Sequence, residues 1–187
     1  MGVRQLEPGH CLTWREGHVE VEGYWDITYR YEDSRREADL LAELAWLVDD
    51  AVRIHSRSDV AVGSHLSGGL DSSAVAGFAA RYIRPLKTFS IRFEGGPYYD
   101  ETGHARAVGA HIGSIHVDEF ANSRELSEVL PALIYHMDFP LPTPGGFGYF
   151  AVSNLARRHV KVSLTGHGGD EIFAGYPKHS WTGIRTG

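Results

Sequence analysis

Hydrophobic and polar positions follow two successive spacings in the N-terminal part of the chain. From Cys11 to Glu22 apolar and polar residues alternate on both sides of Arg15–Gly17, which predicts a β-hairpin. Ser34 and Glu37 then form a capping-box pattern, and the apolar positions that follow recur every three or four residues. This spacing predicts an amphipathic helix from Arg35 to His55.

From Val60 onward, short apolar stretches alternate with segments of helical spacing, which is typical of βα units around a parallel sheet. The predicted strands are Val60–Leu66, Thr88–Phe93, Ser114–Val117 and Val160–Leu164. The predicted helices are Ser72–Ile83, Glu101–Ile112, Arg124–His136 and Phe147–Arg158. Prolines keep Asp138–Gly146 an extended loop. The pattern therefore predicts the α/β class, with a parallel sheet and flanking helices preceded by a short β-hairpin.

Open parallel sheets bind ligands beyond the carboxyl ends of their strands, and the loop after the first predicted strand is rich in candidate chemistry. It reads Ser-Gly-Gly-Leu-Asp-Ser-Ser from Ser67 to Ser73 and leads directly into a helix. Glycines let backbone N–H groups approach an anion, and the helix N-terminus adds positive potential, so phosphate is the expected ligand. Asp71 is an oxygen ligand suited to the Mg²⁺ that accompanies a nucleotide. The alternative is a glycine-rich turn with serine caps.

A second glycine-rich loop, Thr165–Glu171, follows the last predicted strand. It places Asp170 at the start of a helix on the same edge of the sheet, where we expect it to face Asp71. Two carboxylates on one edge suit Mg²⁺, whose remaining positions substrate phosphates can fill. A turn with a capping carboxylate is the simpler alternative for this loop.

Composition narrows the class of partner. The 187 residues are 42% hydrophobic and 22% charged, which is typical of a globular protein with a core. With 18 Lys and Arg against 24 Asp and Glu, the net charge of −6 disfavours nucleic-acid binding. No apolar stretch approaches the roughly 20 residues of a membrane span, and Cys11 is the single cysteine. These features predict a soluble, cytoplasmic protein.

The string Ser67–Ser73 resembles the pyrophosphatase-type loop of ATP-dependent amidotransferases, and its flanks resemble the synthetase domain of glutamine-dependent asparagine synthetases. Thr165–Glu171 is similar to a second signature of that family. The resemblance implies an adenine-nucleotide alpha hydrolase-like fold, ATP and Mg²⁺ as cofactors, and metal binding by Asp71 and Asp170. The nucleotide-binding residues that it implies are Leu66, Ser67, Gly68, Gly69, Asp71, Ser72, Ser73, Ile91, Thr165 and Gly166.

The activity implied by the resemblance is amide formation, with catalytic roles for Asp71, Asp170 and His167. Aspartate is activated as an acyl-adenylate, pyrophosphate leaves, and ammonia opens the intermediate. His167 stands where asparagine synthetases usually carry a glutamate. It is a candidate general base or electrostatic partner, and a spacer in a turn is the alternative. Family members that act on other substrates, such as β-lactam synthetases, differ at the same place. A relative that forms a different amide, such as a β-lactam or a macrocyclic peptide bond, therefore stays open.

The resemblance also suggests a division into parts. Residues 1–23 resemble the end of a glutaminase domain, 24–36 a linker, and 37–187 part of an ATP-dependent synthetase domain. Gly2 stands where a glutaminase exposes its catalytic cysteine, so we expect the chain to be a fragment that takes ammonia or depends on a glutaminase domain or partner chain. A nucleotide-binding fragment without catalysis is the remaining alternative.

Overall fold

The computed structural model describes residues 2–28, 34–93, 100–137 and 145–176. The chain forms two compact units, Met1–Leu40 and Leu41–Gly187, which are described one at a time. The expected division at residues 23 and 36, which rests on the resemblance, stays a prediction. Within the described part of the chain, no helix combines the length and the apolar character that crossing a bilayer requires.

The first unit contains the expected hairpin. Strands β1 (His10–Arg15) and β2 (His18–Gly23) pair antiparallel, with Leu12 opposite Val21. Glu16 and Gly17 connect them, and both have positive φ, 49° and 85°. A two-residue loop with this backbone matches the right-handed twist of paired strands, which explains why the chain reverses here.

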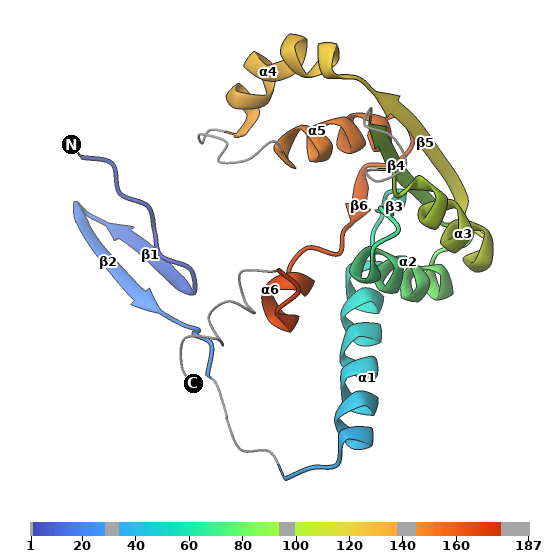
Figure 1. Ribbon diagram of the computed structural model, residues 1–187. Coiled ribbons are helices and arrows are strands. Elements are labelled where there is room, and N and C mark those ends of the chain that lie inside the picture. The colour runs from blue at the N-terminus through green and yellow to red at the C-terminus, as the bar shows by residue number, and fades with distance from the viewer. Residues whose placement is uncertain (1, 29–33, 94–99, 138–144, 177–187) are drawn as a thin grey trace, which may run out of the picture. The chain divides into compact units, whose positions relative to one another are not determined.

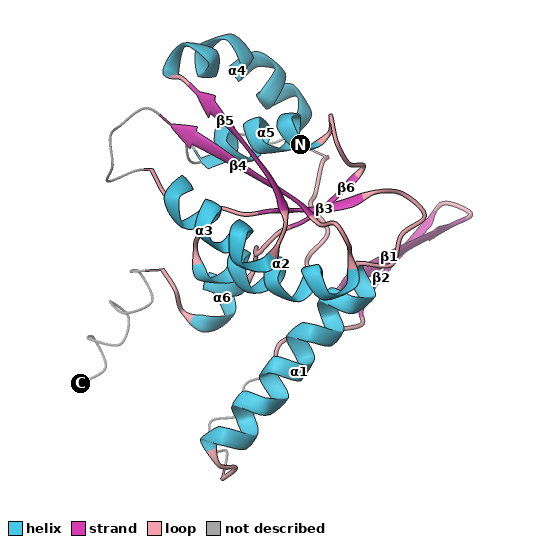
Figure 2. Cartoon of the chain, turned by 90° about the vertical axis from the view of Figure 1, so that its right-hand side faces the viewer, coloured by secondary structure: helices cyan, strands magenta, loops and turns pink. Residues whose placement is uncertain are grey.

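The second unit is built on a four-stranded parallel sheet with the order β5-β4-β3-β6 (Figures 1 and 2). Its strands are β3 (Val62–His65), β4 (Lys87–Phe93), β5 (Ile115–Ala121) and β6 (Val162–Leu164). The chain proceeds from β3 outward to β5 and then returns to place β6 on the other side of β3. Strand order therefore reverses between β3 and β6, and such a switch point is where parallel sheets bind ligands.

Helices cover both faces of this sheet. The helices in the described residues are α1 (Glu37–His55), α2 (Leu70–Tyr82), α3 (Thr102–Ile112), α4 (Ser123–Met137), α5 (Gly145–Ala156) and the short α6 (Gly169–Phe173). One core cluster joins Leu66 to buried residues of α1, α2 and α3, and another joins Phe89 to Leu155 of α5. A third cluster packs α4 on α5 through Leu133 and Phe147. The α/β class, with a parallel sheet, flanking helices and a preceding hairpin, is confirmed.

Most element ends differ from the expected ones by one or two residues, and three differences bear on the sheet and the site. Strand β5 continues past Val117 to Ala121, because β4 pairs with it as far as Phe93. Helix α2 begins at Leu70 instead of Ser72, inside the glycine-rich loop. The prediction of an extended loop over Asp138–Gly146 is wrong for its last two residues, because α5 begins at Gly145. Residues 138–144 lie outside the described residues. An apolar run after these glycines favours the helix.

Candidate active site

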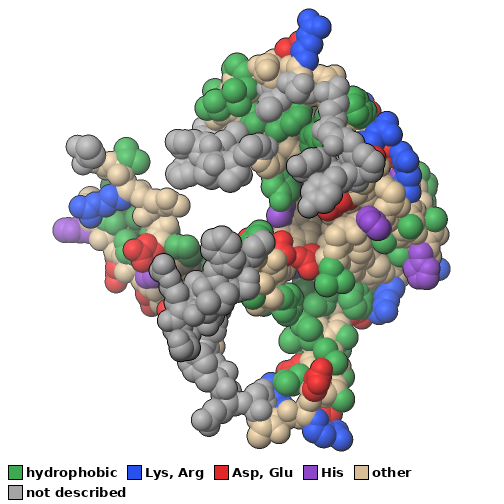
Figure 3. Space-filling view, viewed as in Figure 1, with side chains coloured by type: hydrophobic (Ala, Val, Ile, Leu, Met, Phe, Trp, Pro, Cys, Tyr) green, Lys and Arg blue, Asp and Glu red, His purple; other side chains and the backbone are tan. Residues whose placement is uncertain are grey.

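The two glycine-rich loops leave the neighbouring strands β3 and β6 and border one cavity of about 720 Å³. Strand β4 and helices α5 and α6 contribute its other walls. Figure 3 shows acidic side chains gathered at α6 on its rim. Of the predicted site residues, the cavity is lined by Leu66, Ser67, Gly69, Asp71, Ser72, Ile91, Thr165, Gly166, His167 and Asp170. Gly68 and Ser73 are not among the lining residues.

Serine hydroxyls hold the first loop in shape. Ser72 Oγ donates to the Gly69 carbonyl at 3.1 Å, accepts from the Ser67 amide at 3.2 Å and lies 2.9 Å from Ser67 Oγ. Gly69 is the N-cap of α2, and no side chain caps this helix. The first amides of α2 thus keep their capacity to bind an anion at the cavity.

Gly68 has a packing role. Its φ is +95°, and a Cβ here would lie 2.7 Å from the Ala105 nitrogen and 2.8 Å from His104 Cβ. The loop therefore turns tightly against the start of α3, where only glycine fits. This contact explains why a residue of the predicted phosphate loop is absent from the cavity wall.

The second loop packs directly on the first. A Cβ on Gly166 would lie 2.7 Å from the Ser72 nitrogen and 2.8 Å from the Asp71 carbonyl carbon. A Cβ on Gly169 would overlap the carboxylate of Asp71. Glycine at both positions thus brings the backbones of the two loops together, which places the carboxylate of Asp71 against the second loop.

Asp71 and Asp170 line the same cavity but take different neighbours. A Cβ on Gly175 would overlap Asp170 Oδ1, so that carboxylate lies against the end of α6. Among the described residues, no group of three or more His, Cys, Asp or Glu side chains could hold a metal ion by itself. The candidate Mg²⁺ ligands among the described residues at this cavity are thus a few carboxylates. That Asp170 faces Asp71 stays a prediction.

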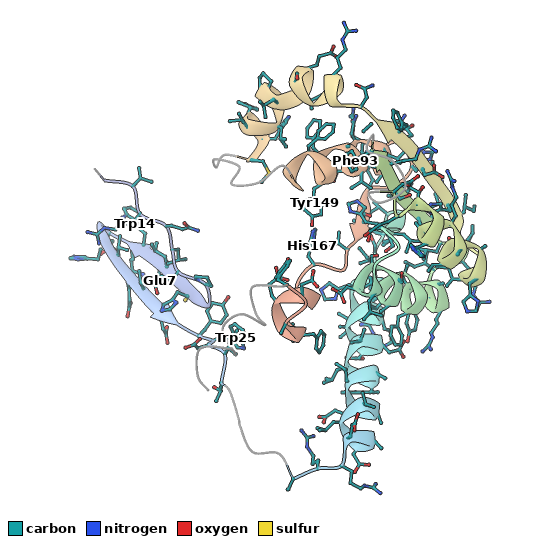
Figure 4. The ribbon with its side chains drawn as sticks, viewed as in Figure 1. Glu7, Trp14, Trp25, Phe93, Tyr149 and His167 are labelled. Carbon is teal, nitrogen blue, oxygen red and sulfur yellow. The ribbon has the colours of Figure 1, made fainter. Side chains whose placement is uncertain are left out.

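His167 lies between two contacts at the cavity. Its Nδ1 is 2.9 Å from Thr165 Oγ1. Its ring meets that of Tyr149 edge to face, with centroids 4.4 Å apart and an interplanar angle of 64°. Figure 4 shows the two side chains pointing toward one another, Tyr149 from α5 and His167 from the loop after β6. Tyr149 was missed by the sequence analysis, because only tertiary packing brings α5 to this loop.

His65 is a second missed residue of the site. It ends β3 and lines the cavity, and its Nε2 is buried without a hydrogen-bond partner among the described residues. Burial, and to a lesser extent the charge of the nearby His167, lower the pKa of His65 to about 4. The imidazole is therefore neutral at neutral pH. A histidine directly before Leu66, in an apolar strand, was the available signal in the sequence.

The expected base pocket involves Leu66 and Ile91. Leu66 is fully buried, and its amide donates to the Phe89 carbonyl at 2.8 Å, which continues the contact of β3 with β4. Ile91 lies two residues further along β4 and also lines the cavity. These two residues and Phe89 form an apolar wall beside the glycine-rich loops, as an adenine ring requires.

Sequence comparison assigns this site to a family. The sequence model of the asparagine synthase family matches residues 43–186, which include both loops and the whole cavity. The chain belongs to the asparagine synthase family. The hairpin of the first unit lies outside the matched part.

Curated relatives in this family are much longer than the chain. It is 35% identical to glutamine-hydrolyzing asparagine synthetase 1 of Bacillus subtilis over 175 residues, which cover 93% of the chain and 27% of that relative. It is 39% identical to a putative asparagine synthetase of Methanocaldococcus jannaschii over 158 residues, 83% of the chain and 30% of that relative. Amidase chyE of Penicillium rubens is 31% identical over 217 residues, 98% of the chain and 32% of that protein. The chain thus spans about three tenths of these relatives.

Among solved structures, an NH3-dependent NAD synthetase from Campylobacter jejuni has a TM-score of 0.42 and 17% identity, covering 66% of the chain and 54% of that protein.

Proposed function

We propose that the chain forms the ATP-activating site of an amide ligase of the asparagine synthase type. The observation that carries the proposal is the backbone packing of the two glycine-rich loops, which combines the amides of α2, the Asp71 carboxylate and Asp170 around one cavity. Binding a nucleoside triphosphate needs anion-binding amides and metal-binding oxygens next to each other, and this arrangement supplies both.

The proposed reaction has two steps. A substrate carboxylate attacks the α-phosphorus of ATP, pyrophosphate leaves, and an acyl-adenylate remains. An amine nitrogen then attacks the acyl carbon, and AMP leaves with the electron pair of the broken C–O bond. The first step depends on positioning and charge neutralisation, which the α2 amides and the hydroxyls of Ser67 and Ser72 supply.

The carboxylates of this cavity fit Mg²⁺. That ion is typically bound by one or two carboxylates together with substrate phosphates, and a cage made of protein ligands alone is unusual. Asp71 and Asp170 both line the cavity, and no larger cluster of metal-binding side chains exists in the described ranges. The two residues would hold the ion that neutralises the triphosphate.

We take aspartate as the first candidate acyl substrate and ammonia, free or derived from glutamine by a glutaminase domain or partner chain, as the nitrogen donor. Membership of the asparagine synthase family supports this choice. A second candidate is a different carboxylate and amine. It is favoured by His167, which stands with Tyr149 at the cavity where a carboxylate is usual for the family.

The test is Asp71→Asn, assayed by ATP-dependent pyrophosphate release with aspartate and with other carboxylates. We expect a loss on the order of 100-fold or more, as for removal of a group that stabilises transition-state charge. Asp59→Asn is the matched control, because Asp59 is exposed and does not line the cavity. Unchanged release in Asp71→Asn, or ATP binding by the wild-type chain without release for any carboxylate, would contradict the proposal.

A further inference from the structure

The ring of His167 is held from two directions. Thr165 Oγ1 contacts Nδ1 at 2.9 Å, and Tyr149 packs against the ring from α5. The other ring nitrogen, Nε2, has no hydrogen-bond partner among the described residues, and His167 lines the cavity. The Thr165 hydroxyl can accept from Nδ1–H or donate to Nδ1, so this contact holds the ring in place and is compatible with either tautomer.

We propose that Thr165 and Tyr149 are positioning residues that hold His167 with its proton on Nδ1 and its Nε2 lone pair available as a base to the attacking amine. The proposal rests on the proposed function and names the proton acceptor of its second step. In this tautomer Nδ1–H donates to Thr165 Oγ1. Since the hydroxyl can donate or accept, the pair at 2.9 Å is compatible with this direction.

The proton balance of the second step follows from this assignment. The amine nitrogen forms a bond to the acyl carbon, the C–O bond to AMP breaks, and AMP takes that electron pair. The nitrogen, which carries a surplus proton after attack, releases it to Nε2 of His167. The products are the amide, AMP and an imidazolium whose Nδ1–H still donates to Thr165.

Other titratable groups share the cavity with His167. The carboxylates of Asp71, Asp170 and Glu171 line it. His65, the second imidazole of the cavity, has a pKa lowered to about 4 and is neutral at neutral pH, so it adds no competing charge. The ring of Tyr149, in edge contact, restricts rotation of the imidazole out of the cavity.

The tautomer can be measured without any turnover. Nitrogen-15 spectra of the full chain, recorded where the imidazole is neutral and assigned with His167→Gln, should show the proton on Nδ1. In Thr165→Val we expect the signal to move toward the Nε2–H form, which free imidazoles prefer. Thr165→Ser, which keeps the oxygen, should retain Nδ1–H. A wild-type Nε2–H tautomer, or no change in Thr165→Val, would overturn the assignment.

A kinetic ratio tests the role of Tyr149. Hydroxylamine is largely unprotonated at neutral pH and opens an acyl-adenylate with less need of a base than ammonia. Tyr149→Leu should therefore lower the ammonia-to-hydroxylamine product ratio about tenfold, and Tyr149→Phe, which keeps the ring, should restore it. Equal loss with both nucleophiles would indicate a structural role only and refute the proposal. Pyrophosphate release in Asp71→Asn distinguishes this outcome from failure of the proposed function: its loss supports ATP activation at this site, and unchanged release contradicts it.

Discussion

Replacing Gly166 by alanine tests the packing of the two loops. Gly166 does not have a positive φ, so alanine is compatible with its backbone and the effect is steric. The new Cβ would lie 2.7 Å from the Ser72 nitrogen, 2.8 Å from the Asp71 carbonyl carbon and 3.0 Å from Asp71 Cβ. Because two of these are backbone atoms of the first turn of α2, no side-chain rotation can relieve the contact.

The magnitude follows from these distances. Non-bonded carbon atoms rest about 3.5–4 Å apart, so the loops must separate by roughly 1 Å. Overpacking of this kind costs about 1–3 kcal/mol of folding free energy. A displacement of about 1 Å near reacting groups can lower turnover by roughly 100-fold, and here it would shift Asp71 and the α2 amides away from Asp170.

Urea unfolding and nucleotide binding measure the two effects. Gly77→Ala in α2, the helix that Gly166 packs against, is the control, since a Cβ there has nothing within 4 Å. Removing a glycine from a helix interior should stabilise by about 0.5–1 kcal/mol. If Gly166→Ala unfolds at the wild-type urea concentration and binds ATP as well as wild type, the inferred close packing of the loops is wrong.

Two further predictions concern the described core. The pKa of His65 is lowered to about 4 from near 6.5, so the unfolded chain binds more protons between these values, and stability should fall as pH falls from 6.5 to 4. The loss of unfolding free energy is at most about 3 kcal/mol and is reduced by partial exposure of the ring. In His65→Leu, urea unfolding measured across this pH range should show a weaker pH dependence. A pH slope identical to that of the wild type would contradict the role of His65. Leu155→Ala should lower the free energy of unfolding by about 2–5 kcal/mol, measured by thermal unfolding, because Leu155 is 1% exposed. Leu41 is exposed on α1, so Leu41→Ala should change stability by less than about 0.5 kcal/mol. Equal effects would contradict the core assignment.

Several features were predictable because they depend on local chemistry. The hairpin around Glu16 and Gly17 and the helical spacing of α1 need no tertiary contact to be recognised. The string Ser67–Ser73 after an apolar strand predicted an anion-binding loop, and the structure places it at the switch point of the sheet. Boundaries were less predictable, since the end of β5 depends on how far β4 accompanies it and not on the residues of β5 alone.

The sequence by itself determined the α/β class, the two glycine-rich loops and the carboxylates they carry, because periodicity and loop composition are properties of neighbouring residues. The tertiary structure decided which of those residues meet. Gly68 packs on α3, Gly166 and Gly169 allow the two loops to come into contact, and Tyr149 packs against His167. Such contacts link residues far apart in sequence, and backbone approach at a glycine leaves no hydrophobic or charge pattern by which a sequence could reveal it.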